Sequence, residues 1–86
     1  MSLIATLATL FGTISGLANL PQAYRIFKRK SAKDISILTY LVIFTGAIVW
    51  ILYGFEIGDS PIIITNVLGT ITISFVMMGW FLYGRD

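Results

Sequence analysis

The sequence predicts an all-α integral membrane protein, a bundle of three transmembrane helices that assembles as a parallel twofold homodimer of six helices. The first observation is composition, because 57% of the residues are hydrophobic and only 12% are charged, far from the pattern of soluble domains. The second is that three long stretches carry no charged side chain. The third is that five of the six basic residues cluster between the first two stretches. At 86 residues, the chain forms one domain, residues 1–86.

The three uncharged stretches predict helices over about 2–27, 35–56 and 60–83. Each is long enough to cross a bilayer, because a span needs about 20 residues at a rise of about 1.5 Å each. The basic residues follow the first stretch instead of preceding it. We therefore expect the first helix to be retained and not cleaved as a signal peptide.

The starts of the second and third helices carry capping residues. Asp34 and Ser36 precede the second helix, and Asp59 and Ser60 precede Pro61, which suits a first helical turn. The connection between these helices is very short. The second and third helices should therefore be antiparallel neighbours.

The basic cluster predicts the orientation of the chain in the membrane. A nucleic-acid-binding arm or a lipid-binding patch can have this composition, but the flanking apolar stretches favour a cytoplasmic loop that obeys the positive-inside rule. The N-terminus and the acidic turn with Glu56 and Asp59 then lie outside, and the C-terminus with Arg85 lies inside. No nucleic-acid partner is expected. The cluster consists of Arg25, Lys28, Arg29, Lys30 and Lys33.

The absent residue types exclude several classes of function. The chain has no cysteine and no histidine, so histidine-centred triads, zinc hydrolase sites and haem ligation are implausible. We expect neither an enzyme nor a cofactor. The only charged side chains of the predicted spans are Arg25 and Glu56 at their ends, and none lies in their interior, whereas ion and proton pathways usually contain a charged residue there. Any solute should therefore be uncharged, and transport should run downhill.

Three helices alone cannot surround an aqueous path wide enough for a solute. A partner is therefore implied. Because the charge bias orients every copy in the same way, the simplest assembly is a parallel twofold dimer.

The first predicted helix contains features of close packing and of weakness. Gly12 and Gly16 form a GxxxG pattern, which favours helix packing over pore lining. Asn19 needs hydrogen-bond partners in hydrocarbon, and Pro21 frees the carbonyl of Leu17. From these residues alone, a fixed kink and a hinge remain equally open.

Two polar or aromatic side chains of the later helices should lie at the same depth. Trp50 and Asn66 lie roughly 7 to 9 Å from the outer turn at about 1.5 Å per residue. An indole face packs on the apolar face of a pyranose ring, and an amide suits adjacent hydroxyl groups. The alternative is that Trp50 packs in the core and Asn66 bonds between helices.

A set of motifs, taken in order, resembles a known family. Leu20-Pro21-Gln22, the basic stretch and Lys33-Asp34-Ile35-Ser36 resemble the PQ-loop signature. With Trp50, Tyr53-Gly54 and Asn66-Val67 added, the whole chain is similar to the bacterial SemiSWEET sugar transporters.

The resemblance implies a fold and a function. The third helix would pack between the first and second, and the homodimer would carry a neutral mono- or disaccharide of the glucose or sucrose class by passive uniport and alternating access. The sugar site would lie on the twofold axis of the dimer. The protein would be located in the inner membrane of a bacterium, where its outer surface contacts lipid. PQ-loop transport of another neutral solute and a non-transporting membrane adaptor or assembly protein are the alternatives. An exporter of hydrophobic cations would need a membrane carboxylate, which the spans lack.

The resemblance also implies roles for single residues. Trp50 and Asn66 would bind the sugar, Pro21 and Gln22 would form the hinge, and Tyr53 with Asp59 would close the outer gate. By their depth in the membrane, the candidates for the inner gate are Asn19, Thr39, Tyr40 and Ile43.

One position departs from the family pattern. Ile57 stands where relatives often have a basic residue that can pair with the acidic gate residue. We expect a Tyr53 hydroxyl contact with Asp59 in its place.

Overall fold

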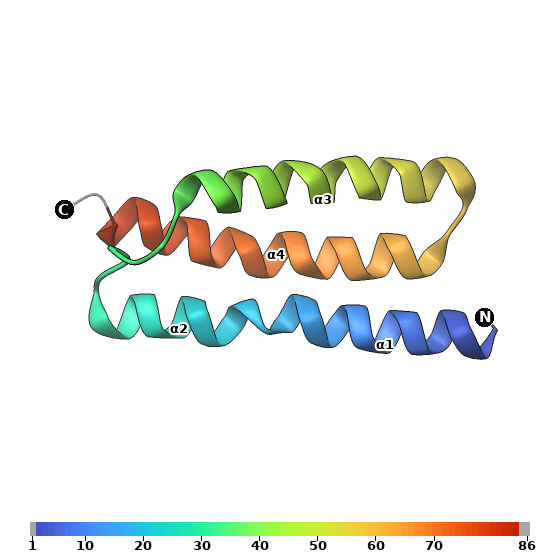
Figure 1. Ribbon diagram of the computed structural model, residues 1–86, viewed down its shortest axis with the longest axis horizontal. Helices are drawn as coiled ribbons and strands as arrows, with labels where there is room; N and C mark the ends of the chain where they lie inside the picture. Colours follow the sequence, from blue (N-terminus) through green and yellow to red (C-terminus); the bar gives the residue numbers. More distant parts are fainter. Residues whose placement is uncertain (1, 85–86) are drawn as a thin grey trace.

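A computed structural model describes residues 2–84. It contains four helical segments: α1 (Leu3–Leu17), α2 (Asn19–Arg29), α3 (Ile37–Ile57) and α4 (Ser60–Tyr83). Because α1 and α2 follow one another almost in line (Figure 1), they form a single stretch of 27 residues that is long and apolar enough to cross a membrane, as are α3 and α4. Within the described residues the three predicted spans are confirmed. Arg85, expected on the inner side, lies outside those residues.

The helices form one flat layer with α4 in the middle (Figure 1). The principal extents are 46 × 21 × 13 Å, so the third dimension is about one helix thick. Helix α4 contacts α1, α2 and α3. This confirms the expectation that the third span packs between the first and the second.

The helix starts follow the predicted capping chemistry. Ser36 Oγ accepts the backbone N–H of Thr39 at 3.3 Å, and Asp59 Oδ1 accepts the N–H of Ile62 at 3.1 Å. Gly58 is the C-cap of α3, with φ at +67°, a left-handed conformation that favours glycine. The Asp59 cap and Gly58 therefore fix the tight antiparallel turn between α3 and α4.

Two boundaries differ from the sequence prediction. The first span is not one helix over 2–27, because it is interrupted at Ala18 and continues to Arg29. The second span begins at Ile37, since Ser36 is its N-cap. Asp34 is not a cap and instead pairs with Arg29, with Nη2 3.6 Å from Oδ2. Both of these side chains are exposed, so the ion pair adds little stability.

The best-packed part of the protomer lies at the basic-loop end. Ala23 and Ile26 of α2, Ala32 of the loop and Val76 of α4 form a buried cluster. Ile26 fits over Gly79, where an added Cβ would collide with its side chain. Close contact between α2 and α4 thus holds the basic end together.

Candidate functional site

A pocket of about 470 Å³ lies along α4 between α1 and α3. No close backbone contact joins α1 to α3 within residues 2–84, so α4 forms the floor and the other two helices form the walls. The volume falls in the range of small-molecule sites, about 300 to 1,000 Å³. None of the lining side chains is charged. The lining residues are Gly12, Ser15, Gly16, Asn19, Ile43, Gly46, Ala47, Trp50, Thr65, Asn66, Gly69 and Ile73.

Trp50 and Asn66 both line this pocket, as their predicted depth requires. The Trp50 side chain is 52% exposed in the protomer, so it is not a residue of the protomer core. Its ring contacts Tyr53 edge-on, with centroids 5.8 Å apart. An apolar ring face beside the pocket remains open to a second molecule.

Asn66 is held by its own helix. Its Nδ2 donates to the carbonyl oxygen of Ile62 at 2.8 Å. An amide has two N–H donors and one carbonyl oxygen, so one donor and the acceptor remain for a ligand in the pocket. The structure therefore brings a fixed amide and an indole ring to one uncharged hollow.

The first span is interrupted next to this pocket. Pro21 lies in the first turn of α2, where its missing N–H leaves no gap in the hydrogen-bond ladder. Asn19 lines the pocket, and its Nδ2 donates to the Gly16 carbonyl at 3.2 Å. Gln22 follows Pro21 and is half-buried. The local weakness expected at Pro21 thus takes the form of a break one turn before it, at Ala18.

The two predicted outer-gate residues, Tyr53 and Asp59, have separate partners in this protomer. The Asp59 carboxylate caps α4, and the Tyr53 ring contacts Trp50. Within residues 2–84 of this protomer, no hydrogen bond links the Tyr53 hydroxyl to Asp59. Ile57 ends α3 with its side chain exposed.

The four candidate inner-gate residues separate into two pairs. Asn19 and Ile43 line the pocket. Thr39 is exposed and its hydroxyl donates to Ser36 Oγ at 2.9 Å, while Tyr40 packs against the buried cluster at the basic-loop end. Only the first pair shares the hollow with Trp50.

The glycine pattern of α1 is explained by packing on α4. A Cβ at Gly12 would lie 2.5 Å from Thr65 Cγ2, and one at Gly16 would lie 3.3 Å from the Gly69 backbone. The helix-packing prediction is confirmed, and both glycines also line the pocket. Sequence reasoning missed Thr65 and Gly69 as pocket residues. The i, i+4 spacing of Thr65 and Gly69, which matches Gly12 and Gly16, was the available signal.

Three apolar spans around a neutral pocket define a small membrane protein of the transporter class. The whole chain, residues 1–86, matches the family model described as "Sugar efflux transporter for intercellular exchange". The chain belongs to this family. Because the family consists of transporters, the expectation that the chain is not an enzyme is confirmed.

Curated relatives and a solved structure agree with this assignment. The chain is 32% identical over 72 residues to a sugar transporter SemiSWEET of Bradyrhizobium diazoefficiens, with 84% of each chain covered. It is 33% identical over 76 residues to the SemiSWEET of Leptospira biflexa, covering 88% of this chain and 86% of that one. A crystal structure of a bacterial homologue of SWEET transporters superposes with a TM-score of 0.90 at 31% identity, over 96% of this chain and 100% of the other.

Proposed function

We propose that the protein carries a neutral mono- or disaccharide across the membrane by passive uniport, through alternating access in a parallel twofold homodimer. The observation that carries this proposal is the uncharged pocket into which α3 and α4 place Trp50 and Asn66 together. The names of the relatives, sugar transporter SemiSWEET, support a sugar as the solute.

The shape of the protomer supports a dimer. A layer one helix thick leaves the pocket without a far wall, and many large apolar side chains are exposed on the same protomer. Lipid can cover the outer surfaces, but a pocket for a polar solute must be closed against hydrocarbon. A second copy, related by a twofold axis along the membrane normal, supplies that wall and a second Trp50 and Asn66.

The two residues suit a sugar for different reasons. The free donor and the free carbonyl oxygen of Asn66 match adjacent hydroxyl groups, which both donate and accept. The exposed Trp50 face matches the apolar C–H face of a pyranose ring. No charge in the pocket attracts an ion, so a neutral solute is favoured.

Alternating access requires the two ends of the pocket to open in turn. At the basic-loop end we assign the hinge to Pro21 and Gln22, beside the break at Ala18, and the inner gate to Asn19 and Ile43, with Thr39 and Tyr40 supporting it. At the opposite end we assign the outer gate to Tyr53 and Asp59, which would meet in the closed state of the dimer.

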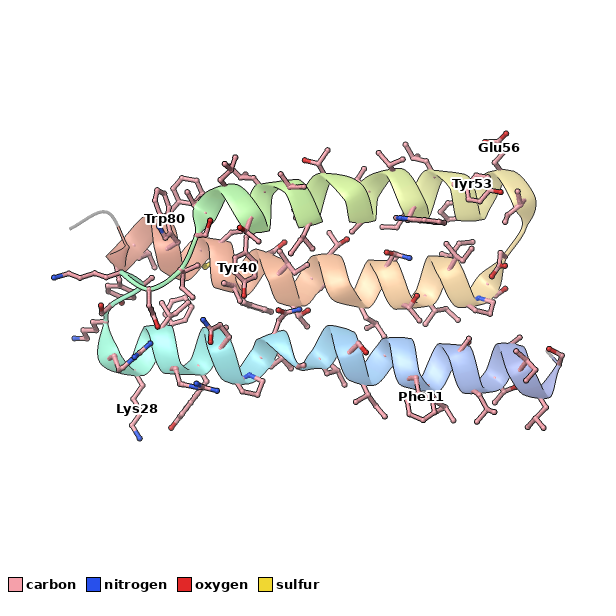
Figure 2. All side chains as sticks on the ribbon, viewed as in Figure 1. Phe11, Lys28, Tyr40, Tyr53, Glu56 and Trp80 are labelled. Atoms are coloured by element: carbon pink, nitrogen blue, oxygen red, sulfur yellow. The ribbon has the colours of Figure 1, made fainter. Side chains whose placement is uncertain are left out.

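The charge distribution supports an orientation. Lys28 lies at one end of the layer, and Tyr53 and Glu56 lie at the other (Figure 2). By the positive-inside rule the Lys28 end is cytoplasmic and the N-terminus is outside, in the inner membrane of a bacterium. Because the native chain has no cysteine, single Ser31→Cys and Glu56→Cys variants can be tested with an impermeant maleimide on intact cells. Labelling should occur at position 56 and not at position 31.

The function is tested by counterflow in liposomes that contain only this protein. Labelled glucose and sucrose should accumulate transiently against an internal excess of unlabelled sugar, at a rate unaffected by a pH gradient, and protein-free liposomes should show no accumulation. Flux of a neutral amino acid in place of sugar would indicate the PQ-loop alternative. No flux of any neutral solute would favour a membrane adaptor.

A further inference from the structure

The interruption of the first span lies at the depth of the bilayer centre. Its contact on α4 is Thr72, about 18 Å along that helix from Ser60 at about 1.5 Å per residue. This is halfway along α4, which ends at Tyr83. With a hydrocarbon core of about 30 Å, water is not available there to hydrogen-bond a carbonyl group, so protein donors at this depth matter.

The Gly16 carbonyl accepts hydrogen bonds from two side chains at this depth. The Thr72 hydroxyl lies 2.7 Å from this oxygen and 3.0 Å from the Gly69 carbonyl of its own helix. Asn19 Nδ2 supplies a second, longer bond to Gly16, at 3.2 Å. Because the Thr72 side chain is 3% exposed and does not line the pocket, it acts on the first span and not on the solute.

At the same point the backbones of α1 and α4 come close together. A Cβ on Gly16 would lie 3.3 Å from the Cα and N atoms of Gly69. On the basic-loop side of the break, α2 has a separate contact with α4, where Ile26 covers Gly79. The two halves of the first span are thus anchored to α4 at different places.

We infer that Thr72 is a positioning residue, which holds the α1 side of the break on α4 while α2 changes its tilt. This inference rests on the proposed function, since it assigns a fixed point to the motion that opens the basic-loop end. The Thr72 hydroxyl keeps Gly16 in place, so movement at Ala18 is confined to α2. Without the bond, α1 shifts with α2 and the pocket wall loses its position.

The test compares a substitution that removes the hydroxyl group with one that keeps it. Thr72→Val removes the hydroxyl and keeps the branched side chain, while Thr72→Ser keeps the hydroxyl. The control is Ser74→Ala, because the Ser74 hydroxyl donates to the Thr70 carbonyl of its own helix, at 2.7 Å. Interhelical hydrogen bonds in membranes are worth enough to expect roughly 3- to 15-fold slower sugar exchange in Thr72→Val. Sugar binding should be unchanged, and Thr72→Ser and Ser74→Ala should exchange at the normal rate.

A second measurement is independent of sugar. Spin labels on Phe11→Cys of α1 and Lys28→Cys of α2, in labelled chains diluted with unlabelled ones, report the distance across the break. Thr72→Val should broaden this distance distribution, and Thr72→Ser should not. The inference is overturned if Thr72→Val leaves both the distribution and the exchange rate unchanged, or if Thr72→Ser is impaired equally. Failure of the wild type to move sugar would instead overturn the proposed function, and the spin-label comparison would still decide the role of Thr72.

Discussion

The Trp50 and Tyr53 rings meet edge-on, with centroids 5.8 Å apart and planes at 77°. This contact joins the pocket to its outer end, because Trp50 lines the pocket and Tyr53 follows three residues later in α3, near the α3–α4 turn (Figure 2). Edge-to-face pairs of this kind are worth about 0.5 to 1.5 kcal/mol beyond the area that they bury. We therefore expect a ligand that displaces Trp50 to disturb this contact with Tyr53 as well.

Trp50→Ala should abolish sugar counterflow in proteoliposomes, because it removes the ring face that the pocket offers to a pyranose. The protomer should remain folded in detergent, since Trp50 is half-exposed in it and supports little of its packing, and dimer formation is checked on the same sample. Leu52→Ala is the matched control, an exposed residue of the same helix that does not line the pocket. Normal counterflow in Trp50→Ala would show that Trp50 is not part of the sugar-binding site.

Asn66→Leu should weaken sugar binding about tenfold or more, because the substitution keeps the side-chain size and removes both hydrogen-bonding groups, each worth about 1 kcal/mol. Equilibrium binding of labelled sugar to detergent-solubilised protein measures the loss. Co-expression with wild-type chains tests whether the site is shared between protomers. Activity below the fraction of wild-type chains is expected, and strictly proportional activity would contradict a site on the twofold axis.

Tyr53→Phe should slow exchange severalfold and leave sugar affinity unchanged. The ring contact with Trp50 is kept, while the hydroxyl that would reach Asp59 in the closed outer gate is lost. Exchange and binding are measured on the same preparation. Wild-type exchange would show that Tyr53 acts through its ring alone and that Asp59 serves only as the cap of α4.

Pro21→Ala should slow exchange while binding is retained. An alanine at this position restores an N–H that can donate to the Leu17 carbonyl, and a continuous helix across Ala18 is then favoured. Measuring both the counterflow rate and the sugar affinity separates an effect on conformational exchange from an effect on binding. An unchanged exchange rate would show that Pro21 is not a hinge and only forms a fixed kink in the first span.

Gly16→Ala should destabilise the protein by about 1 to 3 kcal/mol, because the new Cβ meets the Gly69 backbone, which cannot move aside easily. Gly46→Ala is the comparison, since a Cβ there meets no atom within 4 Å and alanine favours the helix by about 1 kcal/mol. Thermal unfolding in detergent should place the first variant below the wild type and the second at or above it. The reverse order would contradict the packing of α1 on α4.

The sequence by itself determined the three spans, the caps at Ser36 and Asp59, and the common depth of Trp50 and Asn66. These features depend on helix length, on local hydrogen bonds and on a short turn, and each can be counted along the chain. The prediction of a weak point near Pro21 rested on the same kind of local argument, because a missing N–H is a property of one residue.

Only the tertiary structure decided where the first span breaks and what supports the break. Thr72, which donates to the Gly16 carbonyl from another helix, lies 56 positions further along the chain. The hydropathy of a sequence does not show in which order its helices pack. The same limit explains the inner-gate candidates, since depth placed Asn19, Thr39, Tyr40 and Ile43 together. In the structure only Asn19 and Ile43 of these line the pocket. Side chains at the same depth can lie on different faces of a helix, so they contact different neighbours.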